Sequence, residues 1–364
     1  MKISIITSRY GLSGVPLAQL RFARALARKG HNVDYIVGYV NKGNTIPKIP
    51  NVQTIVLNKL RVSNMVFLLI KYLRNEKPDI IFTAGDHLND IVALAAIFAR
   101  SNVKISASSR VTPYDTYSDK IFSKGWILKQ LSRLVMSRIN VLTCVSEDMV
   151  KQYQTIFKNA PHQCVYNIVN DSLSYEKIME PLEDSSLFNK SVPTIIAAGM
   201  LEPWKGFNDL ILAISEVLKI RKVQLIILGE GSMRGELEML IKKLKIESEV
   251  KLIGYVLNPL KYFHQADVFV LSSYVEGLPN VLVESMMCGC TPVSTDCPTG
   301  PSEVLKNGKY GYLVPMHDSK SMSKAIIKAL DSPISAELLK EAIQPFSEDK
   351  VIEKHFALLN KEGK

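Results

Sequence analysis

The chain has 364 residues, 47% of them hydrophobic and 22% charged, which predicts two globular domains and excludes a disordered chain or a small disulfide-stapled scaffold. Five cysteines without a repeated Cys-x-x-Cys pair, and no apolar run of about 18 residues, favour a cytoplasmic protein without disulfides, structural zinc or a spanning helix. The net charge of +10 is uneven: residues 1–170 carry +14 and residues 171–364 carry −4. The first half therefore either meets an anionic partner or has a basic, solubilising surface.

The first half alternates short β-branched segments with amphipathic ones. We expect strands at 2–8, 33–37, 52–57, 80–83, 104–107 and 141–145, and helices at 16–30, 63–75 and 89–100. Buried strands separated by helices are typical of a doubly wound parallel sheet. Residues 1–170 are therefore predicted to form one Rossmann-like α/β domain.

The same alternation restarts after residues 171–192, whose Pro, Ser and acidic residues predict a linker. We expect strands at 194–198, 224–228, 250–253, 268–271 and 292–294, and helices at 207–218, 235–244, 259–264 and 279–288. Residues 193–345 then form a second Rossmann-like domain, and a helix within 346–364 packs back on the first. Open parallel sheets bind ligands beyond the carboxyl ends of their strands, so two facing domains predict a site in the cleft between them.

The segment 276–284 (EGLPNVLVE) follows a predicted strand and carries the strongest chemical signal. Gly277 and Pro279 predict a helix N-terminus there, where backbone amides and the helix dipole bind a diphosphate. Glu276 and Glu284 flank that site and suit sugar or ribose hydroxyls, or else Glu276 only complements the dipole and Glu284 is an unrelated surface residue. The predicted donor-binding positions are Leu278, Pro279, Asn280, Val281, Leu282 and Glu284.

Glu276-x7-Glu284, together with AAGMLEPWKGFNDLI (197–211), LIILGEGSMRGEL (225–237) and TPVSTDCPTGPSEVL (291–305), resembles the retaining, nucleotide-sugar-dependent glycosyltransferases of family 4. The resemblance implies the GT-B fold. It also implies that Lys205 binds the donor diphosphate, that Glu276 contacts the transferred sugar, and that Glu284 binds the nucleotide ribose. One departure is Met200, where the family usually has Arg. Either Arg110 replaces that cation, or leaving-group stabilisation rests on Lys205 and the helix dipole.

The first domain matches the family more weakly. Its Gly11-Leu-Ser-Gly14 loop follows the first strand, and the resemblance implies that Gly14 borders the donor diphosphate and Gly11 the acceptor or its phosphate. Arg110 is a second candidate for that phosphate. The resemblance also implies that His87, just past a strand end, lies near the transferred sugar or acceptor; alternatively it caps the next helix.

The chain contains no Asp-x-Asp triplet, the usual metal–diphosphate clamp of the other main glycosyltransferase fold, so we expect a metal-independent enzyme without a cofactor. No residue stands out as a covalent nucleophile, which favours front-face attack, with the departing phosphate oxygen accepting the acceptor's proton. The CPTGPSEVL segment resembles a subgroup that builds bacterial surface polysaccharides and protein-linked glycans, many using N-acetylhexosamine donors. UDP-GalNAc or UDP-GlcNAc is therefore the expected donor, with UDP-Gal and UDP-Glc still open.

Residues 115–140 are rich in cations and aromatics. A helical wheel predicts a buried stripe of Ile121, Ile127, Leu128, Leu131, Leu134 and Val135, with Gly125 interrupting the helix. The opposite side holds Phe122, Trp126, Lys129 and Arg133. Aromatics among cations predict contact with an anionic membrane surface, although the aromatics also suit packing on a neighbouring loop.

Membrane contact points to a polyprenyl-diphosphate-linked saccharide acceptor and to peripheral attachment at the cytoplasmic face. A second hypothesis is a non-catalytic GT-B protein that binds a nucleotide or glycan partner, for which Met200 is the motivating departure. Nucleic-acid binding is not expected, because the chain lacks an RNP, helix-turn-helix or zinc signature.

Overall fold

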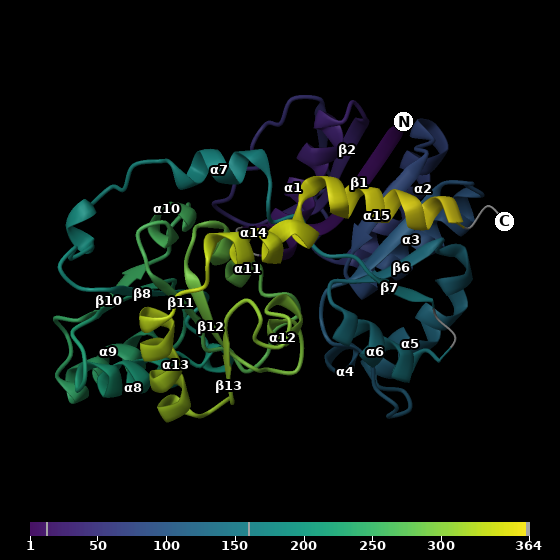
Figure 1. Ribbon diagram of the computed structural model, residues 1–364. Coiled ribbons are helices and arrows are strands. Elements are labelled where there is room, and N and C mark those ends of the chain that lie inside the picture. The colour runs from purple at the N-terminus through teal and green to yellow at the C-terminus, as the bar shows by residue number, and fades with distance from the viewer. Residues whose placement is uncertain (12–13, 159–160, 362–364) are drawn as a thin grey trace. The chain divides into compact units, whose positions relative to one another are not determined.

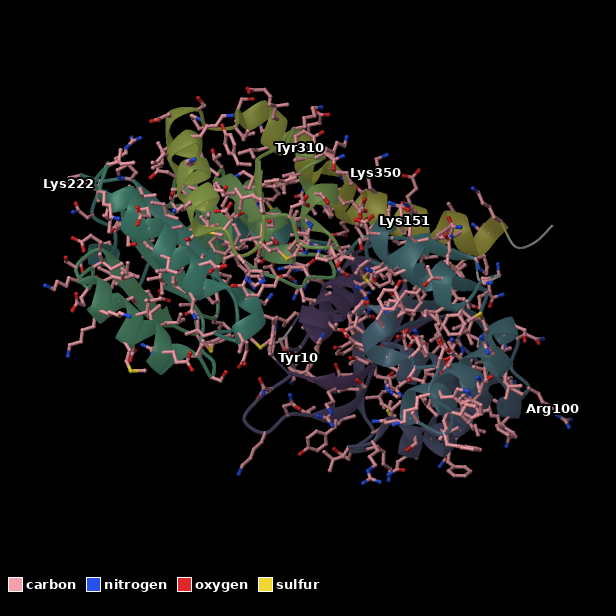
Figure 2. The ribbon with its side chains drawn as sticks, turned by 90° about the horizontal axis from the view of Figure 1, so that it is seen from below. Tyr10, Arg100, Lys151, Lys222, Tyr310 and Lys350 are labelled. Carbon is pink, nitrogen blue, oxygen red and sulfur yellow. The ribbon has the colours of Figure 1, made fainter. Side chains whose placement is uncertain are left out.

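The computed structural model describes residues 1–11, 14–158 and 161–361 (Figure 1). The chain divides into two compact units: Met1–Ile168 with the segment from Glu348 onward, and Val169–Ser347. Each unit contains one parallel sheet with helices packed on it, so the predicted α/β class and the tandem Rossmann-like plan are confirmed. Charged side chains such as Arg100 in the first unit and Lys222 in the second extend from the surfaces of their own units (Figure 2).

The first unit holds a seven-stranded parallel sheet in the order β3-β2-β1-β4-β5-β6-β7. Its strands are β1 (Lys2–Tyr10), β2 (Asn32–Val40), β3 (Val52–Val56), β4 (Ile80–Ala84), β5 (Lys104–Ser109), β6 (Val141–Cys144) and β7 (His162–Cys164). Its α-helices are α1 (Gly14–Arg28), α2 (Val66–Glu76), α3 (Asp86–Ala99), α4 (Pro113–Thr116), α5 (Lys124–Val135), α6 (Glu147–Ile156) and α15 (Glu348–Lys361). Short 3-10 turns are η1 (Val62–Met65) and η2 (Met136–Arg138).

The last helix, α15, belongs to the first unit although it is last in sequence. Its buried apolar residues share one core with α1 and with alternate strand residues such as Ile3 and Ile5. Arg28 at the end of α1 pairs with Glu348, and Lys29, the next residue, pairs with Asp349 at 2.6 Å. The apolar face of α15 is therefore buried against a sheet that lies much earlier in the chain. Lys104, on β5 of that sheet, also donates from its Nζ to the Leu359 carbonyl at 3.2 Å.

The second unit holds a six-stranded parallel sheet in the order β10-β9-β8-β11-β12-β13. Its strands are β8 (Thr194–Ala198), β9 (Gln224–Leu228), β10 (Val250–Gly254), β11 (Val268–Leu271), β12 (Thr291–Thr295) and β13 (Tyr312–Val314). Its α-helices are α7 (Ser172–Ile178), α8 (Phe207–Leu218), α9 (Arg234–Leu244), α10 (Leu260–Phe263), α11 (Asn280–Met287), α12 (Pro301–Val304), α13 (Ser319–Asp331) and α14 (Ala336–Ile343). Its 3-10 turns are η3 (Ser185–Leu187), η4 (Pro203–Lys205) and η5 (Gln344–Phe346).

Residues 171–192, expected to be a linker, instead hold α7 and η3 and lie within the second unit. Lys261 on α10 pairs with Glu183 at 2.6 Å, and the Asn258 amide donates to the Lys177 carbonyl at 2.8 Å. The segment has no clean hydrophobic period, and it is held to the unit by these polar contacts together with two isolated buried apolar side chains, Ile178 and Phe188.

Strand order reverses once in each sheet, between β8 and β11 in the second unit and between β1 and β4 in the first. In parallel α/β sheets the loops that follow two such neighbouring strands diverge, and ligands bind beside them. The loops after β8 and β11 carry Lys205 and Glu276, and the loops after β1 and β4 carry Gly11 and His87. Topology thus places the predicted site residues of each unit at its own reversal point.

Candidate functional site

Lys205 and Glu276 form an ion pair in the second unit. The Lys205 Nζ lies 2.5 Å from Glu276 Oε1, and their side chains are 18% and 11% exposed. Lys205 ends η4, after β8, while Glu276 lies in the loop after β11. Two largely buried groups of opposite charge, each able to exchange its partner for a phosphate or a hydroxyl, make a site suited to an anionic, hydroxyl-bearing ligand.

Hydrogen bonds to backbone carbonyls hold the loop after β8 and the loop after β11 together. The Ser272 hydroxyl donates to the Lys205 carbonyl at 2.7 Å, and the Tyr274 amide donates to the Trp204 carbonyl at 2.8 Å. Gly206 has φ +63°, and a Cβ built there would lie 2.1 Å from the Ser272 carbonyl oxygen. Only glycine therefore allows the two loops to approach this closely.

The helix expected at 279–288 is α11, which begins at Asn280. The prediction that the amides of residues 278–282 bind an anion needs correction in part. Pro279 has no N–H, and the amides of Asn280 and Leu282 already donate to the carbonyls of Leu278 and Pro279, at 2.9 and 3.0 Å. Among those five positions the candidate donors are thus Leu278 and Val281. Glu284 lies farther along α11 and is buried.

In the first unit the structure places Gly11 at the end of β1 and Gly14 at the start of α1, while residues 12 and 13 between them lie outside the described residues. His87 is exposed on the first turn of α3. Partial burial and the nearby Lys124 lower the His87 pKa, an effect that Asp86 opposes. A mainly neutral imidazole at a strand end is suited to accept or donate a single hydrogen bond.

Arg110 follows β5 and points inward. Its guanidinium donates to Asn167 Oδ1, while its buried Nε has no hydrogen-bond partner among the described residues. Burial lowers the Arg110 pKa to about 10. Gln19, Thr83 and Arg110 line one cavity of about 20 Å³, room for a single water molecule.

The predicted faces of the 115–140 segment are wrong in several places. Lys129, expected on the outer side, is buried and pairs with Asp119 at 2.6 Å, whereas Trp126 is half-buried and Arg133 is exposed. Three residues of the expected core stripe are exposed, by 65% for Ile121, 55% for Ile127 and 76% for Leu134. Phe122 is 82% exposed, as predicted for the outer side.

Two physical reasons explain the difference. Helix α5 begins only at Lys124, so Ile121 and Phe122 lie in a loop and do not follow the phase of the helix. Gly125 lies inside α5 rather than interrupting it, and its glycine is explained by close packing, since a Cβ there would come within 2.9 Å of the Ser118 backbone nitrogen. The buried face of α5 is formed by Leu128, Lys129, Ser132 and Val135.

A cluster of exposed residues lies where α5 begins. We define the α5 tip as Lys120, Ile121, Phe122, Lys124 and Ile127, all of them exposed. Phe122 has φ +62°, an uncommon backbone conformation for an aromatic residue, and its ring lies 5.7 Å from that of Trp126. The tip therefore presents apolar side chains next to cations.

Sequence patterns did not identify two residues at the Lys205–Glu276 site. Thr299 donates its hydroxyl to the Glu276 carbonyl, and the Tyr274 hydroxyl donates to Asp209 at 2.8 Å. The position of Thr299 within CPTGP, two residues before a helix, was the available signal.

Within the described ranges, no helix is long and apolar enough to cross a membrane and no group of three or more His, Cys, Asp or Glu residues is placed to hold a metal ion.

Two family models together match most of the chain. The model described as Glycosyltransferase Family 4 matches residues 13–173, and the one described as Glycosyl transferases group 1 matches residues 179–345. The boundary between the two matches falls near the division between the two units at residue 168.

Similar proteins and solved structures are also glycosyltransferases or share the fold of one. An uncharacterized glycosyltransferase of Methanocaldococcus jannaschii is 30% identical over 67% of this chain, and the match spans 62% of that protein. The Campylobacter jejuni N-acetylgalactosamine-N,N'-diacetylbacillosaminyl-diphospho-undecaprenol 4-alpha-N-acetylgalactosaminyltransferase is 29% identical over 75% of this chain and 73% of its own length. The crystal structure of Anabaena HepE in complex with UDP shares the fold, with a TM-score of 0.74 and 18% identity over 99% of this chain and 100% of that one. The chain therefore belongs to glycosyltransferase family 4 and has the GT-B fold.

Proposed function

We propose that this chain is a retaining, metal-independent glycosyltransferase of surface-glycan assembly. It moves a hexose or N-acetylhexosamine from a UDP-sugar, with UDP-GalNAc and UDP-GlcNAc as the leading donors. The acceptor is a saccharide linked to polyprenyl diphosphate. The Campylobacter relative is named for a transfer of this kind, and HepE was solved with UDP, which supports the choice of acceptor and nucleotide.

The Lys205–Glu276 pair is the observation that carries the proposal. In the absence of donor the two groups neutralise each other. When the donor binds, Lys205 turns to the diphosphate and neutralises the charge that develops as the glycosidic bond breaks. Glu276 then accepts hydrogen bonds from hydroxyls of the transferred sugar, and Glu284 binds the ribose. Front-face attack lets the departing phosphate oxygen take the acceptor's proton, so no separate general base is needed.

The enzymatic test compares hydrolysis and transfer of UDP- and GDP-sugars by the wild type, Lys205→Ala and Glu276→Gln. A matched control is Lys219→Ala, since Lys219, just after α8, pairs with Glu216 at 2.6 Å but is 67% exposed. We expect one UDP-sugar to be used, both site variants to lose at least a hundredfold in turnover, and the control to match the wild type. An NMR assignment of the product anomer tests retention, and activity that survives EDTA supports metal independence.

The opposite results decide against the proposal in distinct ways. No turnover together with no UDP binding in calorimetry would contradict the enzyme proposal and favour the non-catalytic GT-B protein. Full activity in Lys205→Ala would remove the role given to the ion pair. Activity that EDTA abolishes and Mg²⁺ restores would contradict metal independence alone.

The α5 tip is the proposed contact with an anionic membrane surface. Its exposed Ile121, Phe122 and Ile127 suit the headgroup boundary, while Lys120 and Lys124 attract anionic lipid. This assignment keeps Phe122 and replaces the buried Lys129. Such attachment brings the enzyme to a lipid-linked acceptor.

Flotation with phosphatidylglycerol vesicles at physiological salt tests the contact. Phe122→Asn removes the apolar side chain while keeping a residue that tolerates positive φ. Phe67→Ser is the matched control, because Phe67 is 80% exposed on α2, away from the tip. We expect the first variant to float at least threefold less than the wild type and the control to float normally. Equal flotation of all three, or none by the wild type, would contradict the assignment.

A further inference from the structure

A side-chain network next to the Lys205–Glu276 pair joins helix α8 to the loops after β11 and β13 in the second unit. The Tyr274 hydroxyl donates to Asp209 Oδ2 at 2.8 Å, and Asp209 lies on the first turn of α8, four residues after Lys205. His317, in the loop after β13, places its Nδ1 3.9 Å from the same Asp209 oxygen. Its ring lies against that of Tyr274, with centroids 3.9 Å apart.

The backbone of His317 indicates that this arrangement is maintained at a cost. His317 has φ +59°, a conformation that glycine adopts without strain and other residues adopt with a penalty of roughly 1 kcal/mol. The side chain is 66% exposed, so burial does not explain its presence. Its ring packs on the Tyr274 ring, and residues held in such backbone conformations cluster at functional sites.

Tyr274 is also close to both members of the ion pair, in sequence to Glu276 and in space to Lys205. Its amide donates to the Trp204 carbonyl at 2.8 Å, one residue before Lys205, and its own chain reaches Glu276 two residues later. The hydroxyl bond to Asp209 anchors the opposite side of the Lys205 loop. Tyr274 therefore links the two segments that carry the charges, through its backbone amide on one side and its hydroxyl on the other.

We infer that Tyr274 is a positioning residue, which through its hydrogen bond to Asp209 and its contact with His317 sets the geometry of Lys205 and Glu276. This inference deepens the proposed function, because it assigns what holds the two site residues before the donor arrives. The role inferred for Tyr274 requires no contact with the sugar or the diphosphate. Its effect on turnover is transmitted through the ion pair.

The test is the coupling between Lys205 and Glu276, measured without ligand. Urea unfolding of Lys205→Met, Glu276→Gln and the double variant yields that coupling, and the cycle is repeated in a Tyr274→Phe background. We expect Tyr274→Phe to remove at least half of the coupling. Tyr262→Phe is the control, since the Tyr262 hydroxyl donates to Glu183 at 2.9 Å elsewhere in the unit, and it should leave the coupling unchanged.

His317→Gly separates positioning from general stability. Glycine relieves the positive-φ strain, so the thermal midpoint should not fall, while the coupling should still decrease. An unchanged coupling in Tyr274→Phe, or a full coupling in His317→Gly, would overturn the inference. Donor turnover should fall at least fivefold in Tyr274→Phe. A wild type that uses no donor would contradict the proposed function, whereas the ligand-free coupling would still decide the role of Tyr274.

Discussion

His355 predicts how the stability of the first unit depends on pH. The side chain lies on α15, buried between Phe22 and Phe82, with its Nδ1 3.4 Å from the Ser106 hydroxyl. Burial, with smaller effects from the charges of Arg110 and Lys354, lowers the His355 pKa from 6.5 to about 3. The folded unit thus holds a neutral imidazole over most of the accessible pH range.

The sign follows from the two pKa values. As the pH falls, the unfolded chain binds the proton near pH 6.5 while the folded unit does not, so stability present above pH 6.5 is lost progressively towards pH 3. With these values the loss between pH 7 and pH 5 is about 2 kcal/mol. The variant His355→Leu keeps an apolar side chain of similar size and removes the titration. As the pH falls from 7 to 5, the free energy of unfolding of this variant, relative to that of the wild type, should therefore rise by about 2 kcal/mol.

Tryptophan fluorescence gives a reporter for this unit alone. The chain has two tryptophans, Trp126 in the first unit and Trp204 in the second, so a Trp204→Phe background isolates the first. Urea unfolding at pH 7 and pH 5 is then compared between wild type and His355→Leu in that background. A difference that stays constant within about 0.5 kcal/mol would refute the conclusion that His355 is held neutral by burial.

Burial and backbone geometry at other positions lead to further expected outcomes. Burial raises the Asp90 pKa from 3.8 to about 7, so the stability that Asp90 contributes is present in full below pH 3.8 and is lost as the pH rises through 7. Between pH 5 and pH 8 the free energy of unfolding of Asp90→Asn, relative to that of the wild type, should therefore rise by about 2–3 kcal/mol. Gly206→Ala should lose at least about 2 kcal/mol of unfolding free energy and most donor turnover, because of its positive φ and its contact with the Ser272 carbonyl. Gly235→Ala on α9 has open space around its Cβ and should gain up to about 1 kcal/mol; a loss there would contradict the helix assignment. All five cysteines are buried, so a thiol reagent should label the native protein slowly and all five thiols only after unfolding; rapid native labelling would contradict that burial.

Local pattern determined much of the second unit. The helix expected at 207–218 and the strands expected at 224–228 and 268–271 match α8, β9 and β11 residue for residue. These segments combine a regular spacing of hydrophobic residues with glycine or polar residues at their ends, and their apolar faces are buried in one core. The secondary structure that the local sequence favours is therefore the one that the packing of the core requires. Lys205 and Glu276 were chosen as candidate site residues from sequence alone, through the spacing of a motif and a family resemblance, and their roles stay a prediction.

What sequence could not supply was which distant groups meet. Lys205 and Glu276 are 71 residues apart, and only the reversal of strand order between β8 and β11 brings their loops into contact. The outward face of α5 was predicted wrongly because the pairing of Lys129 with Asp119 depends on the path of the preceding loop, which no helical wheel contains. The burial of Arg110 and His355 likewise depends on α15, which joins the first sheet from the far end of the chain. Hydrophobic period is a property of neighbours in sequence, whereas charge pairing and desolvation depend on neighbours in space.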